Sequence, residues 1–173
     1  MKVTALVHFA VLVTALTTPA AWPQSPAVEL ADAEGTITGG GDAARVRYTI
    51  RVPKGANLNR TGEQRDAYSH PYNSFVSWQV QVDKTPVRTL EAAVKDSTIP
   101  GRRTTPEGSA VEGGFQVVIR PTSSDVVDAE VRTYKIGASG AVRARCSGPA
   151  KEVATLIAMC STLQALPPSS AAK

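Results

Sequence analysis

The sequence predicts an α+β fold in which a mainly antiparallel sheet of five or six strands packs against one C-terminal helix. Three observations predict it. The chain has 173 residues, of which 42% are hydrophobic and 20% charged, which is the size and composition of one ordinary domain. Several segments alternate apolar and polar residues, as half-buried strands do, and one segment near the C-terminus repeats its apolar residues with the period of a helix.

The clearest strand lies at residues 45–52. Val46, Tyr48, Ile50 and Val52 alternate with arginines and threonine, so one face is apolar and the other basic. Pro53 and Gly55 then end the segment. We therefore expect this strand to have one buried face and one solvated face.

Further strands follow from weaker forms of the same pattern. Residues 75–82 place Trp78 among valines on one face, so we expect its indole in the core. The remaining expected strands are residues 35–38, 115–119, 127–136 and 141–146. Residues 137–140 are rich in glycine and form a good hairpin between the last two strands.

Two segments predict helices. Residues 90–95 follow Thr89, a suitable N-cap. Pro149 suits a first helical turn, and residues 150–166 carry one apolar stripe before two prolines end the helix. The stripe consists of Val153, Leu156, Ile157, Cys160 and Leu163. The core expected from all these elements consists of Val46, Tyr48, Ile50, Trp78, Val80, Phe115, Val117, Val142, Leu156 and Ile157.

The N-terminus has the composition of a signal peptide. Lys2 precedes an apolar stretch over residues 3–16, and small residues follow up to an expected cleavage near Ala20 or Ala21. This stretch is shorter than the roughly 20 apolar residues of a membrane-spanning helix, so we expect no transmembrane segment in the mature chain. The expected divisions are a signal peptide at 1–21, an N-terminal spacer at 22–34, the α+β domain at 35–166 and a flexible tail at 167–173. We expect the mature protein in a periplasm or outside the cell.

Cys146 and Cys160 are the two cysteines of the chain. Strand alternation places Cys146 on the apolar face of its strand, and the helical period places Cys160 on the apolar stripe, so the thiols face each other if the helix folds back onto the sheet. In an oxidising compartment this favours one disulfide. The alternative is a pair of buried, reduced cysteines, and a redox-active pair is disfavoured because the chain has no Cys-x-x-Cys motif.

Two long polar segments provide candidate binding residues. Residues 54–73 and 96–114 are rich in turn-forming residues, and we expect the first to be a loop and the second a loop or an irregular edge. Because long loops often carry recognition residues, the candidate contacts are Tyr68, His70 and Tyr72 in the first segment and Arg102 and Arg103 in the second. The alternative is a surface excursion without a binding role.

Arginines provide a second candidate surface. Arg45, Arg47 and Arg51 share one strand face, and Arg143 and Arg145 share another. If these two strands are neighbours, the sheet presents a basic surface on which an acidic protein or an anionic polymer docks. The alternative is the ordinary solvated face of an antiparallel sheet.

Composition disfavours several kinds of chemistry. The net charge of +4 is too small and dispersed to indicate a nucleic-acid binder. His70 is the one histidine that remains after removal of the signal peptide, which argues against a metal site, and no Gly-x-Ser-x-Gly motif accompanies it. We expect no cofactor. No catalytic carboxylate pair stands out among the acidic residues, which include Glu107, Glu112, Asp125, Asp128 and Glu130.

The order of elements resembles small exported bacterial proteins with a PsbP-like α/β sandwich. The resemblance rests on Val52-Pro53-Lys54-Gly55, Ser77-Trp78-Gln79-Val80, Leu90-Glu91-Ala92-Ala93 and the closing strand, Ser-Gly-Pro and helix from Arg143 to Leu163. It implies a central antiparallel sheet with helices packed on it and a non-catalytic accessory or binding role. Some periplasmic immunity proteins, which block toxins of competing bacteria, have a similar build.

The function we expect is non-catalytic binding of a protein partner, one that is acidic if the arginine face is used. An immunity protein that inhibits a toxin enzyme is a specific form of this hypothesis. Two alternatives stay open, which are a small hydrolase acting on cell-wall or extracellular polymer and a carrier of a small apolar ligand held between sheet and helix.

Overall fold

The computed structural model describes residues 28–38, 45–60, 64–71, 77–98, 104–122, 128–137 and 140–167. The expected signal peptide, its cleavage site, Tyr72, Arg102 and Arg103 lie outside these residues. The described strands are β1 (Leu30–Ile37), β2 (Val46–Pro53), β3 (Asn57–Arg60), β4 (Arg65–Pro71), β5 (Ser77–Thr85), β6 (Thr104–Val111), β7 (Gly114–Pro121), β8 (Asp128–Gly137), β9 (Gly140–Pro149) and β10 (Gln164–Leu166). The described α-helices are α1 (Leu90–Ser97) and α2 (Val153–Cys160), and a short 3-10 turn, Ala150–Glu152, precedes α2.

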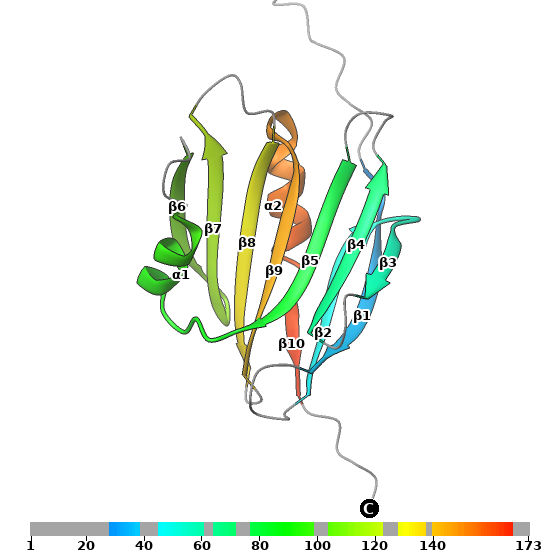
Figure 1. The fold of residues 1–173 in the computed structure, drawn as a ribbon, viewed down its shortest axis with the longest axis horizontal. Coiled ribbons are helices and arrows are strands. Elements are labelled where there is room, and N and C mark those ends of the chain that lie inside the picture. Colours follow the sequence, from blue (N-terminus) through cyan, green and yellow to red (C-terminus); the bar gives the residue numbers. More distant parts are fainter. Residues whose placement is uncertain are drawn as a thin grey trace, which may run out of the picture.

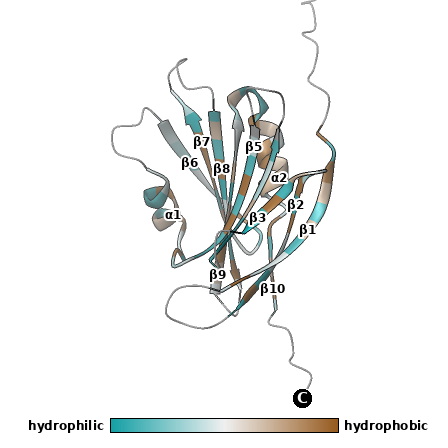
Figure 2. Ribbon diagram, turned by 45° about the vertical axis from the view of Figure 1, so that its right-hand side comes forward, coloured by the Kyte–Doolittle hydropathy of each residue, from teal (hydrophilic) through white to brown (hydrophobic). Residues whose placement is uncertain are grey.

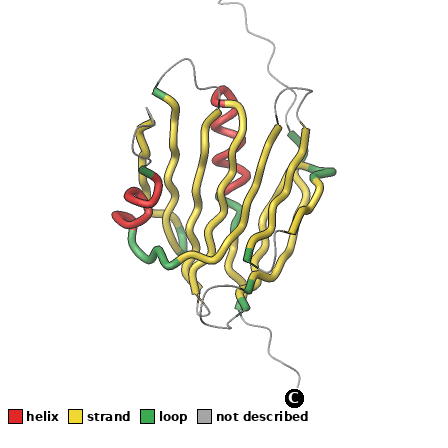
Figure 3. Tube along the Cα trace, in the orientation of Figure 1, coloured by secondary structure: helices red, strands yellow, loops and turns green. Residues whose placement is uncertain are grey.

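The described strands form two antiparallel sheets (Figures 1 and 3). The large sheet has the order β3-β4-β5-β9-β8-β7-β6, and the small sheet has the order β1-β2-β10. Mainly antiparallel pairing with a helix on the apolar face agrees with the predicted α+β class. The expected number of strands was too low, because ten strands are divided between two sheets rather than five or six in one.

The two helices lie on opposite faces of the large sheet (Figure 1). Helix α2 packs against β8 and β9, and the small sheet stacks beside it over β4, β5 and β9, so that together they cover what we call the inner face. Helix α1 packs against β6 and β7 on the other side, which we call the outer face. The outer faces of β3, β4, β5 and β9 therefore lie beyond the strands on which α1 packs.

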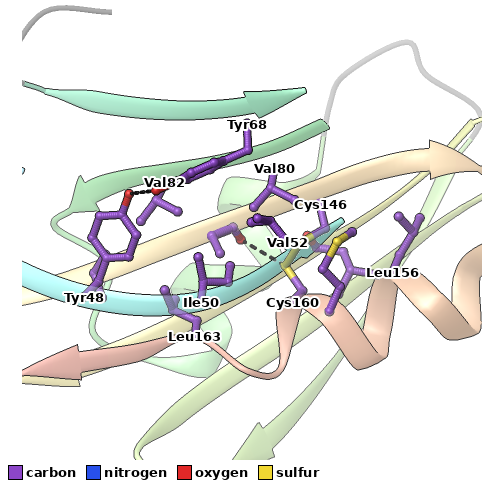
Figure 4. Packing of buried hydrophobic residues seen from close by; sticks show 14 of the residues in the cluster. Tyr48, Ile50, Val52, Tyr68, Val80, Val82, Cys146, Leu156, Cys160 and Leu163 are labelled. Atoms are coloured by element: carbon purple, nitrogen blue, oxygen red, sulfur yellow. Dashed lines mark hydrogen bonds between the residues drawn. A yellow bond between two sulfur atoms is a disulfide. The ribbon is translucent and has the colours of Figure 1, made fainter. Parts of the chain in front are cut away.

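The main core lies between the large sheet and the layer formed by α2 and the small sheet (Figure 4). Trp78, Tyr48 and Leu156 are among its largest fully buried side chains. Figure 2 shows hydrophobic residues alternating with hydrophilic ones along β2 and β5, which is the pattern that gives each strand one buried face. Eight of the ten predicted core residues are buried, while Phe115 and Ile157 are only partly buried.

A second, smaller cluster lies under α1 on the outer face. Val117 and Ile119 of β7 point into it, together with Ala93 of α1 and Tyr134 of β8. Helix α1 begins as predicted, because the Thr89 side chain accepts a hydrogen bond from the Ala92 amide. Strand β8 is therefore buried on both sides, because Val131 belongs to the main core and Tyr134 to the smaller cluster.

The predicted disulfide between Cys146 and Cys160 is confirmed (Figure 4). It joins β9 to the last residue of α2, with the two Cα atoms 5.8 Å apart and both residues fully buried. The bond therefore fixes α2 against the inner face of the large sheet.

The prediction of a loop over residues 54–73 is wrong for most of the segment. It forms β3 and β4, and β4 pairs with β5 along its whole length. The polar composition of this hairpin has a physical reason, because its inner face buries Asp66 and Tyr68 in hydrogen bonds rather than a row of aliphatic residues.

Two element boundaries also differ from the prediction. The C-terminal helix spans Val153–Cys160 rather than residues 150–166, because Gln164–Leu166 leave the helix to pair with β2 as β10. Leu163 is nevertheless buried, which explains why it fits the helical stripe. The first strand begins at Leu30, inside the segment expected to be a spacer.

Candidate functional site

The outer face of four neighbouring strands presents polar side chains in register. On β5, Trp78, Val80 and Val82 belong to the core, so the intervening residues face outward. The same alternation holds on β4 and β9, and the register extends it to β3. We call these residues the outer polar face. They are Asn57, Asn59, Arg65, Ala67, Ser69, Gln79, Gln81, Asp83, Arg143, Arg145 and Ser147.

Asp83 holds two arginines of this face in place. The Arg143 guanidinium donates to both of its carboxylate oxygens at 2.9 and 2.8 Å, and Arg145 Nη2 donates to Oδ2 at 2.8 Å. Bidentate contacts of this kind fix the plane of a guanidinium as well as its position. Because the Asp83 and Arg143 side chains are only 10% and 12% exposed, these ion pairs are protected from solvent screening.

A second carboxylate ties the end of α1 to the sheet. Asp96 Oδ2 accepts hydrogen bonds from Arg143 Nη1 at 2.6 Å and from Tyr134 Oη at 2.9 Å, and it lies 3.2 Å from Arg132 Nη1. Arg132 also pairs with Glu130. Arg143 therefore bridges Asp83 on β5 and Asp96 on α1, which links the outer polar face to the helix.

The ionisation of Asp96 reflects these contacts. Burial acts to raise the pKa of this carboxyl, but the Tyr134 hydrogen bond and the charges of Arg143 and Arg132 together lower the pKa below its ordinary value. The ionised form is thus favoured in the folded protein. Its stabilisation is present above the ordinary aspartate pKa of about 4 and is lost as the pH falls through the lower, folded value.

The direction of the Asp96 pKa shift can be tested by substitution of this residue. Asp96→Asn should destabilise the protein at neutral pH, and the difference from the wild type should be smaller at an acid pH below the lowered pKa of the folded carboxyl, where the wild-type group is also protonated. Urea unfolding midpoints at the two pH values measure this. Asp128→Asn is the control, because Asp128 is exposed and forms no ion pair with another described residue. An Asp96→Asn deficit that is equal at both pH values would contradict the assignment.

Two of the predicted contact residues of the first polar segment, Tyr68 and His70, lie among the described residues. Tyr68 is removed from the candidates, because it is 5% exposed and its hydroxyl lies 3.0 Å from that of Tyr48 in the core. His70 is half-buried on β4, opposite Trp78 and beside Gly55. Because Tyr68 is buried, Tyr68 and His70 do not form an accessible contact surface together.

A buried polar cluster explains the position of Tyr68. Tyr48 Oη donates to Asp66 Oδ2 at 2.6 Å, and Asp66 is 3% exposed. Arg60 approaches the other carboxylate oxygen at 3.3 Å from the rim. Burial is the largest cause that raises the pKa of both Tyr48 and Tyr68, so the two hydroxyls stay protonated and available for hydrogen bonding. This cluster joins β2 of the small sheet to β4 of the large sheet, so it has a structural role.

The two arginine-bearing strands are not neighbours, so the condition for one basic surface shared by five arginines is not met. Arg143 and Arg145 lie on β9 of the large sheet, whereas Arg45, Arg47 and Arg51 lie on or beside β2 of the small sheet. The β1–β2 surface is moreover a ladder of opposite charges, in which Glu34 pairs with Arg47, Asp32 with Arg51 and Glu29 with Lys54. Arg45 is exposed at the start of this ladder.

The outer polar face was only partly visible in the sequence. The alternation in residues 75–82 places Gln79 and Gln81 opposite the core, and the same argument places Arg143 and Arg145. The missing signal was the pairing of β5 with β9, which brings Asp83 opposite Arg143 although they are 60 residues apart in the chain. Nothing in the local pattern marked Arg65, because it lay in a segment predicted to be a loop.

Within the part of the chain that the structure describes, no group of three or more His, Cys, Asp or Glu residues is arranged to hold a metal ion. No helix among the described residues has the length and apolar character needed to cross a membrane.

Comparison of the sequence with protein-family models and with curated proteins found no match. The resemblance to PsbP-like exported proteins therefore stays a prediction. The function must be argued from the chain's own residues.

Proposed function

We propose that the protein is a non-catalytic binding protein of the periplasm or the extracellular medium, and that it recognises a protein partner through the outer polar face. The observation that carries this proposal is a set of polar groups facing outward from four paired strands, beyond the strands on which α1 packs. Antiparallel sheets commonly have one solvated face. Here that face also holds fixed guanidinium groups.

The arrangement supports binding because its charged groups are preorganised. Arg143 and Arg145 are held by Asp83, so they lose little conformational freedom when a partner binds. Gln79 and Ser69 are exposed beside them and offer amide and hydroxyl groups for direct hydrogen bonds. Rigid donors surrounded by neutral polar groups are suited to a protein interface with about one hydrogen bond per 100–200 Å².

The titratable groups with shifted pKa values favour a structural assignment over a catalytic one. Tyr48 and Tyr68 are hydrogen-bonded in the core, and Asp96 and Arg143 belong to the ion pairs that hold α1. Shifted pKa values mark an active site when they occur in an accessible cleft, and structural ion pairs shift pKa values as well.

The disulfide supports the proposed compartment. A buried disulfide is stable in a periplasm or outside the cell and is rare in reducing compartments. The apolar N-terminal stretch of the sequence points to the same location. Intact-mass measurement of protein purified from each cell fraction tests this part of the proposal, with cleavage expected near Ala20 or Ala21.

Blocking variants test the binding surface. Ser69→Trp adds a large side chain to an exposed position on β4, and Thr36→Trp adds the same side chain to an exposed position on β1 of the small sheet. Affinity capture with the tagged mature chain should retain one stoichiometric protein partner. We expect Ser69→Trp to reduce that partner's retention at least tenfold, while Thr36→Trp retains it at the wild-type level. A loss of about 1.4 kcal/mol of binding free energy corresponds to this factor.

The opposite pattern would move the interface to the small sheet and contradict the proposal. Absence of any stoichiometric partner would favour the alternative that the chain carries a small ligand. If the captured partner is an enzyme, an assay of its activity with and without the wild-type chain tests the immunity hypothesis.

A further inference from the structure

We propose that the partner is an acidic protein segment and that Arg65 of the outer polar face is the anchor that binds its carboxylates. This inference rests on the proposed function, because it assigns the chemistry of the partner at the same outer polar face. It follows from the charge balance of the face and from the hydrogen bonds that are already made there.

The outer polar face carries an excess of positive charge. Among the described residues on this face of β3, β4, β5 and β9 there are three arginines and one aspartate, which gives a net charge of +2. The arginines are Arg65, Arg143 and Arg145, and the aspartate is Asp83. Arg143 is further neutralised by Asp96 of α1. Because Asp83 and Asp96 together offset the two arginines of β9, the uncompensated charge lies on β4, on the side away from α1.

Arg65 is the residue that this balance leaves without a counter-ion. It lies directly opposite Asp83 in the β4–β5 pair. Both oxygens of that carboxylate already accept hydrogen bonds from Arg143, and Arg145 shares one of them. Arg65 forms no ion pair with any other described residue. Its guanidinium is thus free to bind an external carboxylate, for which its planar fork is well suited.

The other arginines at the surface are less available. Arg60, on the same hairpin, points to the inner side, where it pairs with Asp66. Arg47 and Arg51 of β2 are neutralised by Glu34 and Asp32. Charge complementarity therefore favours binding of an acidic segment to the outer polar face rather than to the small sheet.

The neighbouring groups favour protein over nucleic acid. Gln81 lies between Ala67 and Arg145, one row away from Arg65 on the same face, and Gln79 and Ser147 belong to the following row. Amides and hydroxyls can pair with the backbone and polar side chains of a partner. Single-stranded nucleic acid needs aromatic rings on which bases stack, and the described outward residues of these four strands include none.

The test uses hexaglutamate as the probe and the full mature chain labelled with ¹⁵N. Amide shifts should concentrate on residues 65–69, 79–83 and 143–147. Arg65→Gln should weaken hexaglutamate binding about three- to fivefold, the effect of losing one exposed ion pair. Arg45→Gln removes an equally charged, exposed side chain from the small sheet and should leave the affinity unchanged. Raising the salt to about 1 M, where the Debye length is about 3 Å, should abolish the shifts in the wild type.

Three results would overturn the inference. These are no hexaglutamate shifts on the outer polar face at low salt, a larger loss in Arg45→Gln than in Arg65→Gln, or tighter binding of an oligonucleotide of equal charge. Because both arginine variants are surface changes, their amide spectra without the probe report whether they are folded. If Ser69→Trp abolishes partner capture but Arg65→Gln leaves both partner and hexaglutamate binding intact, the proposed function stands and the acidic-segment inference fails.

Discussion

Gly35→Ala is expected to destabilise the protein by roughly 2–6 kcal/mol, the sum expected for overpacking and for disrupting a buried hydrogen bond. Gly35 lies on β1 directly opposite Tyr48, and the tyrosine hydroxyl passes over it to reach Asp66. A Cβ atom at this position would lie well inside van der Waals contact of both Tyr48 Oη and Asp66 Oδ2. The backbone of β1 must move, or the buried carboxylate must lose its donor.

Denaturant unfolding of Gly35→Ala and of two comparison variants measures this effect. Gly113→Ala adds the same methyl group in open space, with a cost of roughly 1–2 kcal/mol from its positive φ of 68°. Tyr48→Phe leaves Asp66 without its shortest hydrogen bond and should cost about 1–3 kcal/mol. If Gly35→Ala is no more destabilising than Gly113→Ala, the close contact of Gly35 with Tyr48 and Asp66 would be contradicted.

Removing the disulfide should have an effect of similar size. The bond closes a loop with a sequence separation of 14 residues, and a cross-link of this length contributes about 3 kcal/mol by restricting the unfolded chain. In the double variant Cys146→Ala and Cys160→Ala, α2 keeps its apolar contacts but loses its covalent link to β9. We expect the folded structure to persist with lower stability.

Urea unfolding in the presence and absence of reductant distinguishes the cross-link from the packing of the two sulfur atoms. Wild-type protein unfolded in reductant should approach the stability of the double variant, whereas the variant should not respond to reductant. Equal stability of the oxidised wild type and the variant would show that the disulfide adds nothing. Two free thiols in freshly purified protein would contradict the bond itself.

The central strands and the start of α1 could be predicted from the sequence because their signals are local. Val46, Tyr48 and Ile50 are buried on alternate positions, as the pattern requires. Thr89 caps α1, and the short connection after β8 joins it to β9 in the expected hairpin. In each case the residues that carry the signal are the residues that form the structure.

The β3–β4 hairpin and β10 could not be predicted because their partners are distant. Tyr68 and Asp66 are buried only because Tyr48 of the other sheet supplies a hydrogen bond, so the segment lacks the apolar alternation of an ordinary strand. Residues 164–166 continue the pattern of the preceding helix in the sequence. They form a strand because they pair with β2. Tertiary contacts outweigh local propensity at both places.

The sequence predicted which kinds of residue face outward at the candidate site, but it did not predict which of these residues meet. Arg143 and Arg145 were correctly placed on a polar strand face, yet the sequence did not indicate that Asp83 neutralises them or that Arg65 stays unpaired. Strand order decides which charges meet, and alternation within a strand contains no information about strand order.

The most direct test of the binding surface is amide hydrogen exchange of the mature chain with and without its captured partner. Strands β3 and β4, residues 57–60 and 65–71, lie at the edge of the large sheet, where opening is expected to be frequent in the free protein. The account predicts slower exchange there in the complex and unchanged exchange in residues 30–37 and 46–53 of the small sheet. Protection confined to the small sheet, with no change in the β3–β4 hairpin, would contradict it.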